Sequence, residues 1–231
     1  CCTELLFQEA LARAKWLDDC LEENGKTVGP LHGLPISIKD ALNIKGFDST
    51  AGYVSFIGNR KSINEHAAIV KLLFELGAIV PVKTNVPTTL MSADSENNIF
   101  GRTLNPLNLT LTAGGSSGGE ASLIKQRGSL IGVGTDIGGS LRIPAVCCGV
   151  YGFRPSNFRY PQEGQVEKER INYFTPVVAV TGPMAFDLES LNQMMNLILS
   201  NPSAPKYDPT FLDLPWNNNL VLPQKIRVGV V

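Results

Sequence analysis

The chain has 231 residues, of which 43% are hydrophobic and 18% charged, proportions that suit a globular protein with a substantial core. Its 20 basic and 21 acidic residues give a net charge of −1 and are not gathered into blocks. This balance excludes the positive field that nucleic-acid binding needs. No apolar run reaches the roughly 20 residues of a membrane span, and the first residues carry no visible signal peptide.

Five cysteines and two histidines bear on the redox environment and on metal binding. An odd number of cysteines with two adjacent pairs is a poor disulfide framework, and two histidines supply no zinc-like spacing. We therefore expect reduced thiols in a cytoplasmic protein that uses no metal and no other cofactor. The cysteines are Cys1, Cys2, Cys20, Cys147 and Cys148.

The first part of the chain predicts helices that alternate with short strands. Apolar residues recur at helical spacing over residues 6–24, which indicates an amphipathic helix. Residues 36–39 form a short strand in which Ser37 and Lys39 point to one face and the two isoleucines to the other. A second helix is expected over residues 64–76, followed by an apolar strand at 78–82.

The later part of the chain continues this alternation. A third helix is expected to start after Gly118 and Gly119 and to reach about residue 126, and the apolar run 130–133 follows it. A fourth helix runs over residues 187–198, with Asp187 as its N-cap. After a connection rich in proline and asparagine, residues 225–231 have the composition of a strand.

Helices that alternate with short apolar strands predict an α/β fold with a central mixed β-sheet and helices on both faces. The chain stops inside the strand predicted at 225–231, which is unusual. We therefore expect residues 1–231 to be a single domain that is truncated at its carboxyl end.

Two glycine-rich segments bracket the third helix and the strand after it. Residues 114–120 read Gly-Gly-Ser-Ser-Gly-Gly-Glu, and residues 134–140 read Gly-Thr-Asp-Ile-Gly-Gly-Ser. Residues 114–140 hold nine of the 22 glycines. Because glycine costs backbone entropy, two such clusters favour close backbone approach at a site over tight turns alone.

Three kinds of site fit these segments. A phosphate cradle is disfavoured because neither nucleotide-binding glycine pattern is present. A second reading is an oxyanion hole beside a nucleophilic Ser140, in which the amides of Ile137, Gly138, Gly139 and Ser140 precede a helix whose start Pro144 delays. A binding loop without chemistry is the third reading, and the residues alone leave it open.

A nucleophilic serine needs a base, because its hydroxyl is inert at its ordinary pKa. The histidines do not fit this role well, since His32 lies in a loop and His66 on a predicted helix surface. A Ser–His–Asp triad is therefore disfavoured. Lys39 at the end of its strand is the remaining base, although a lone lysine is more often a solvated charge.

Three segments resemble, in order and spacing, the amidase signature family: residues 33–40 (Gly-Leu-Pro-Ile-Ser-Ile-Lys-Asp), 114–120 and 134–140. Residues 52–58 and 152–156 are similar to the fungal acetamidase and general-amidase branch, which is related to fatty acid amide hydrolases. The resemblance runs from about residue 29 to the end of the chain. The family's catalytic domain is usually much longer, which agrees with a truncated chain.

The resemblance implies a catalytic set of three side chains. Ser140 is the implied nucleophile, Ser116 the bridging serine after a cis peptide bond, and Lys39 the general base. The backbone amides of Ile137 to Ser140 are the implied oxyanion hole.

The resemblance also implies supporting residues around this set. Leu90 corresponds to a position that contacts substrate, and Ser117, Asp136 and Arg142 correspond to positions that hydrogen-bond around the catalytic groups. One departure from the family pattern is Asn157, which begins a segment where many relatives carry a Gly-Arg turn.

The implied activity is hydrolysis of a small-molecule amide to an acid and ammonia or an amine, through an acyl-enzyme. Lys39 must be uncharged to act, which requires that burial lowers its pKa and that the charge of Asp40 points away. An inactive fragment or binding module is the alternative function, and a glutamine-amidohydrolase subunit of an amidotransferase is less favoured. The sequence leaves the oligomeric state open, with a homodimer as one option.

Overall fold

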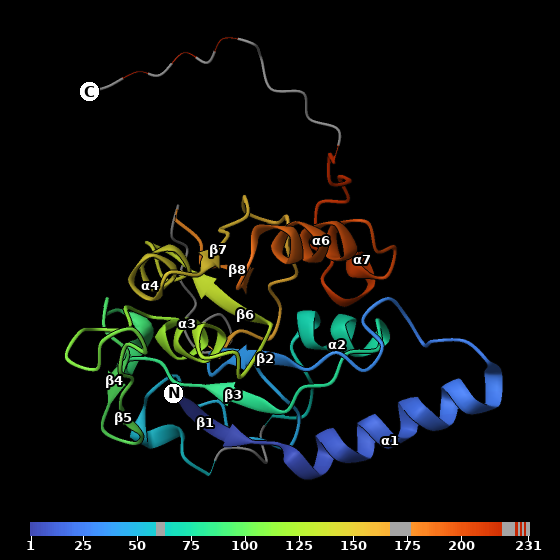
Figure 1. Ribbon diagram of the computed structural model, residues 1–231, viewed down its shortest axis with the longest axis horizontal. Helices are drawn as coiled ribbons and strands as arrows, with labels where there is room; N and C mark the ends of the chain where they lie inside the picture. The colour runs from blue at the N-terminus through green and yellow to red at the C-terminus, as the bar shows by residue number, and fades with distance from the viewer. Residues whose placement is uncertain (59–62, 167–176, 219–224, 226, 228, 230–231) are drawn as a thin grey trace.

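A six-stranded mixed sheet lies at the centre of the computed structural model, which describes residues 1–58, 63–166, 177–218, 225, 227 and 229 (Figure 1). Its strand order is β1-β3-β2-β6-β8-β7. β2 pairs in parallel with both β3 and β6, and the other neighbours are antiparallel. The strands of this sheet are β1 (Cys2–Leu5), β2 (Ile36–Lys39), β3 (Val82–Thr84), β6 (Ile131–Asp136), β7 (Tyr151–Gly152) and β8 (Val180–Ala185), and a separate hairpin joins β4 (Glu96–Asn97) to β5 (Gly101–Arg102).

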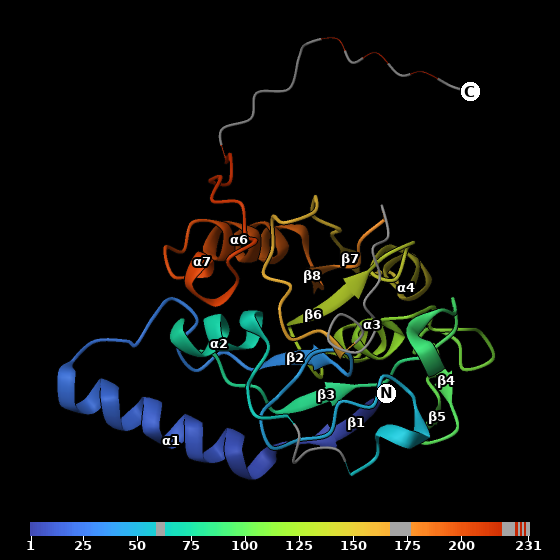
Figure 2. The same cartoon turned by 180° about the vertical axis from the view of Figure 1, so that it is seen from behind.

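Helices cover both faces of this sheet, as the sequence predicts (Figures 1 and 2). Ile36 and Ile38 of β2 pack into the main core with side chains of α2 and α6. On the opposite face, Ser37 of β2 contacts Glu120 of α3. The helices are α1 (Phe7–Asn24), α2 (Ala68–Glu75), α3 (Gly118–Lys125), α4 (Arg142–Cys148), α6 (Leu188–Leu199) and α7 (Ala204–Tyr207), and η1 (Val54–Phe56) and η3 (Thr88–Leu90) are short 3₁₀ helices.

Several predicted elements are confirmed with close boundaries. α1 ends at Gly25, whose φ of 64° gives the left-handed C-cap that glycine favours. β2 covers the predicted residues 36–39. Asp187 caps α6 by accepting a hydrogen bond from the Ser190 amide at 2.8 Å.

Two predicted boundaries are wrong. α2 begins at Ala68, four residues later than expected, because Ala67 is extended (ψ 149°) and its amide donates to the Asn43 carbonyl at 2.8 Å. The strand expected at 78–82 is β3 at 82–84 instead. Pro81 has no N–H to donate, and regular pairing starts after it.

Five strands, β1, β4, β5, β7 and β8, are not predicted from the sequence, and one predicted strand lies mostly outside the described residues. β8 contains a glycine and a proline, which are depleted in strands, yet it pairs with β6 along its whole length. β1 is a short strand at the edge of the sheet. The strand expected at 225–231 falls mostly outside the described residues.

Candidate active site

Lys39 is fully buried at the end of β2 and contacts a serine of the first glycine-rich segment. Its Nζ lies 2.6 Å from the Ser116 Oγ. Thr135, at the end of β6, supplies two further contacts: its Oγ1 lies 2.8 Å and its carbonyl oxygen 3.3 Å from the same nitrogen. The strand alternation predicted from the sequence therefore brings Lys39 to the glycine–serine face of the sheet.

The Gly115–Ser116 peptide bond is cis, as the family resemblance implies. Ser116 is 1% exposed, and Ser95 supports its loop. The Ser95 hydroxyl donates to the Gly114 carbonyl at 3.0 Å and accepts from the Gly118 amide at 3.0 Å. Only glycine fits at position 115, since a Cβ there would lie 2.5 Å from a backbone carbonyl oxygen.

Ser140 lies in the wall of a cavity of about 230 Å³. Its carbonyl accepts a hydrogen bond from the Ser117 amide at 3.1 Å, which ties the two glycine-rich segments together. Among the hydrogen bonds of the described residues, none joins the Ser116 and Ser140 hydroxyls. The cavity is lined by Leu90, Met91, Ser92, Ala93, Gly115, Ile137, Gly138, Ser140 and Ile143.

The cavity thus brings together residues that the sequence analysis selected separately. Leu90 enters it from η3 with an unusual φ of 60°, and Ile137 and Gly138 enter it from the segment between β6 and α4. Leu90 is 5% exposed, whereas the neighbouring Met91 is 71% exposed. One wall of the cavity is therefore buried and apolar, and another is open to solvent.

The four amides expected to form an oxyanion hole differ in their partners. The Gly139 amide donates to the Asp136 Oδ1 at 2.7 Å, so in this structure it is directed to that carboxylate. The amides of Ile137, Gly138 and Ser140 have no hydrogen-bond partner in the part of the chain that the structure describes. α4 begins at Arg142, which agrees with the late start predicted from Pro144.

Asp136 is fully buried and organises this turn. Besides Gly139, it accepts from the Leu141 amide at 3.0 Å and from the Arg142 Nε at 3.0 Å. Arg154 Nε lies 3.4 Å from the same carboxylate. Burial alone would raise the pKa of Asp136, but hydrogen bonds from Arg142 and the two amides outweigh it and hold the pKa below its usual value.

Ser117 is buried behind the cavity and joins the same group of contacts. Its hydroxyl donates to the Thr135 carbonyl at 3.3 Å. This is the carbonyl that also contacts the Lys39 Nζ. Ser117 thus links the contacts of Lys39 to the turn that carries Ser140.

Thr135 and Glu120 were not predicted as site residues, although both lie within the two glycine-rich segments 114–120 and 134–140. Glu120 is fully buried on α3 and accepts from the Ser37 hydroxyl at 2.5 Å and the Thr84 hydroxyl at 2.8 Å. Burial raises the pKa of Glu120 to about 8, against the opposing effect of the two hydroxyls. At neutral pH the carboxyl is therefore mostly protonated.

Asp40 points away from the cavity, as the sequence analysis required. Its Oδ1 forms an ion pair with the Lys83 Nζ of β3 at 2.7 Å, and both side chains are fully buried. Its other oxygen accepts from the Thr50 hydroxyl at 2.6 Å. Lys83 was also not predicted as part of this site. Its place directly after the apolar residues 78–82 is the sequence signal that could have indicated a buried lysine there.

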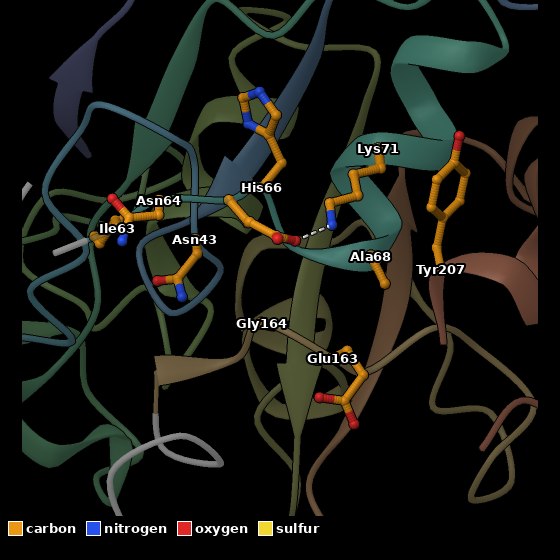
Figure 3. A pocket seen from close by; sticks show the side chains of 10 residues that line it. Asn43, Ile63, Asn64, His66, Ala68, Lys71, Glu163, Gly164 and Tyr207 are labelled. Carbon is orange, nitrogen blue, oxygen red and sulfur yellow. Dashed lines mark hydrogen bonds and ion pairs between the residues drawn. The ribbon is translucent and has the colours of Figure 1, made fainter. Parts of the chain in front are cut away.

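Neither histidine contacts these groups in the described structure. The His32 Nδ1 accepts from the Val28 amide at 3.0 Å. His66 lies before α2, where its Nδ1 accepts from the Lys45 amide at 3.1 Å. His66 borders a second cavity of about 320 Å³, which also holds the Glu65–Lys71 ion pair (Figure 3). A Ser–His–Asp triad therefore finds no support.

A protein-family model described as Amidase matches residues 1–231. The chain belongs to the amidase family. Its curated relatives include an amidase of Gibberella moniliformis, 45% identical over 99% of this chain and 42% of the relative, and an acetamidase of Aspergillus oryzae, 44% identical over 93% of this chain and 39% of the relative.

Solved amidase structures share the fold. A fatty acid amide hydrolase superposes with a TM-score of 0.88 at 43% identity, over 94% of this chain and 38% of that one. A bacterial aryl acylamidase superposes with a TM-score of 0.82 at 30% identity, over 93% of this chain and 43% of that one. The chain spans about two fifths of the length of these amidases.

The described residues were also compared with the requirements for a membrane span and for a metal site. Over the described ranges, no helix has the length and apolar character needed to cross a bilayer. The same residues hold no group of three or more side chains that could bind a metal ion.

Proposed function

We propose that the protein hydrolyses the amide of a carboxylic acid to the acid and ammonia or an amine, through an ester of Ser140. The observation that carries this proposal is the 2.6 Å contact between the Lys39 Nζ and the Ser116 Oγ at a fully buried lysine. A solvent-exposed lysine would be hydrated and would not need such a contact with a buried serine. Membership of the amidase family supports the same reaction class.

Lys39 and Ser116 form the proposed proton route. The Ser116 hydroxyl gives its proton to the uncharged Lys39 nitrogen and takes the proton of Ser140, whose oxygen bonds to the amide carbon. When the C–N bond breaks, the proton returns by the same route to the leaving nitrogen. Water then attacks the Ser140 ester with help from the same pair, and the acid leaves.

The cavity supplies the other two requirements of the reaction. In this proposal the amides of Ile137, Gly138 and Ser140 stabilise the oxyanion that forms when Ser140 attacks. The apolar side chains of Leu90 and Ile143 favour an apolar acyl group in the substrate. The length of that group is best measured with a series of amides from short aliphatic to long acyl chains.

Substitution of the nucleophile tests the proposal. We expect Ser140→Ala in the complete protein to lower kcat for amide hydrolysis by about a thousandfold or more, because members of a relay act as a unit. It should also abolish covalent labelling of the protein by a fluorophosphonate. Ser156→Ala, at an exposed serine, is the matched control and should retain both properties. Hydrolysis by Ser140→Ala near the wild-type rate would overturn the assignment.

A further inference from the structure

Three carboxyl groups belong to residues that adjoin Lys39 in the chain or in the fold, and the negative charge of each could oppose its action as a base. Asp40 follows it in the chain, Glu120 approaches from α3, and Asp136 follows Thr135, which contacts the Lys39 nitrogen. A negative charge near a buried lysine favours the ammonium form. Lys39 can accept a proton at neutral pH only if these charges are cancelled.

The negative charges of two of the three carboxyls are removed by their own surroundings. Asp136 is paired with Arg142 and Arg154. Glu120 has no charged partner within hydrogen-bond distance among the described residues, and its two contacts are hydroxyls. Burial keeps Glu120 mostly protonated at neutral pH.

The negative charge of Asp40 is neutralised by Lys83, which has no role in the proposed reaction. Lys83 is fully buried on β3, and its Nζ lies 2.7 Å from the Asp40 Oδ1. The same nitrogen donates to the Asp48 carbonyl at 2.7 Å and to the Ser49 hydroxyl at 2.5 Å. The parallel pairing of β2 with β3 sets Lys83 beside Ile38 and Thr84 beside Lys39. Lys83 and Asp40 therefore lie on the face opposite to Lys39.

We propose that Lys83 is a positioning residue for the amidase reaction, which cancels the charge of Asp40 and thereby keeps Lys39 uncharged at neutral pH. This inference rests on the proposed function. It assigns the buried pair an electrostatic effect on the base through the strand, in addition to its contacts with the 48–50 loop.

Neutral substitutions of the pair give opposite results under this inference. Lys83→Met in the complete protein leaves the Asp40 charge without its partner, so the acid limb of the kcat/KM–pH profile should move to higher pH. Asp40→Asn leaves Lys83 alone and should move this limb to lower pH. Each shift should be about one pH unit, the size expected for one buried charge several ångströms away. The double variant should return the limb towards its wild-type position.

A purely structural role would not produce opposite shifts that cancel in the double variant. Lys71→Met, which removes a partly exposed lysine paired with Glu65, is the matched control and should leave the limb in place. Thermal unfolding measurements establish which variants fold. If Lys83→Met does not fold, a shift of the acid limb to lower pH in Asp40→Asn supports the inference, and any other result for that variant contradicts it. The inference would be overturned if the acid limb of the kcat/KM–pH profile did not move, or if it moved in the same direction in both single variants.

Failure of the proposed function has a different signature. If the wild-type protein neither hydrolyses amides nor reacts with a fluorophosphonate at Ser140, the proposed function fails and takes the inference with it. If the wild type is active and only the shifts are missing, the inference alone fails.

Discussion

Glu120 is a single side chain that joins three elements near Lys39. It lies on α3 and accepts hydrogen bonds from Ser37 of β2 and Thr84 of β3. A Cβ on Gly132 of β6 would lie 1.9 Å from its carboxyl oxygen, so β6 also needs glycine at this contact. A buried carboxylic acid here fixes the sheet to the helix that follows Ser116.

The raised pKa of Glu120 predicts how stability depends on pH. Burial raises it from 4.5 to about 8, so its contribution to stability is fully present below pH 4.5 and is lost as pH rises through about 8. We expect Glu120→Gln to make the free energy of unfolding less dependent on pH between 5 and 9 than in the wild type. Urea denaturation at several pH values measures this. The wild-type slope in Glu120→Gln would contradict it, and Glu9→Gln, at an exposed position of α1, is the control.

The glycine–serine segment that carries Ser116 leads into α3, so its position depends on how α3 packs against its neighbours. α3 starts directly after Ser117 and faces β2, β3 and β6. Glycine at its start allows backbone contact: a Cβ on Gly119 would lie 2.3 Å from the Asn85 amide nitrogen and 2.7 Å from the Cys1 carbonyl oxygen. The glycine content of residues 114–120 therefore reflects close packing as well as chemistry.

Gly119→Ala tests this packing against helix propensity. Alanine favours a helix over glycine by about 1 kcal/mol, but the backbone of Asn85 cannot move aside easily. We expect a net destabilisation of about 1–3 kcal/mol, as for other overpacked sites, measured by chemical denaturation. Gly138→Ala, whose Cβ would meet nothing within 4 Å, should keep wild-type stability. A Gly119→Ala protein as stable as the wild type would show that the contact relaxes at no cost.

The cavity beside Ser140 is open to solvent on one side in this chain. Leu90 is buried, but Met91 is 71% and Ile143 37% exposed, and the chain spans about two fifths of the length of its relatives. An enzyme pocket normally buries most of its ligand. The described residues hold the proposed chemical groups and leave one side of the cavity exposed.

Production of residues 1–231 alone tests how far these groups act without more protein. We expect Ser140 in this form to react with a fluorophosphonate roughly tenfold or more slowly than in the complete protein, because small losses of positioning cost rate steeply. The labelling rate, followed by intact-protein mass spectrometry, measures this. Circular dichroism must first show that both forms fold. Equal rates would mean that the groups described here are sufficient to activate the serine.

The sequence by itself determined the elements that carry the site. Periodicity located α1, β2 and α6, and the strand alternation at residues 36–39 placed Lys39 on the face of Ser37, opposite to the two isoleucines. The second glycine-rich segment suggested Ser140 as a nucleophile, and Ser116 came only from the resemblance to the amidase signature family. These features follow from local spacing, which a single chain records directly.

The tertiary structure alone decided which distant groups meet. It paired Lys39 with Thr135, directed the Gly139 amide to Asp136, and neutralised Asp40 with Lys83. It also added β8 to the sheet despite its unfavourable composition. These outcomes depend on strand order and on burial, which set hydrogen-bond partners and charge states across residues far apart in the chain, and no local spacing encodes them.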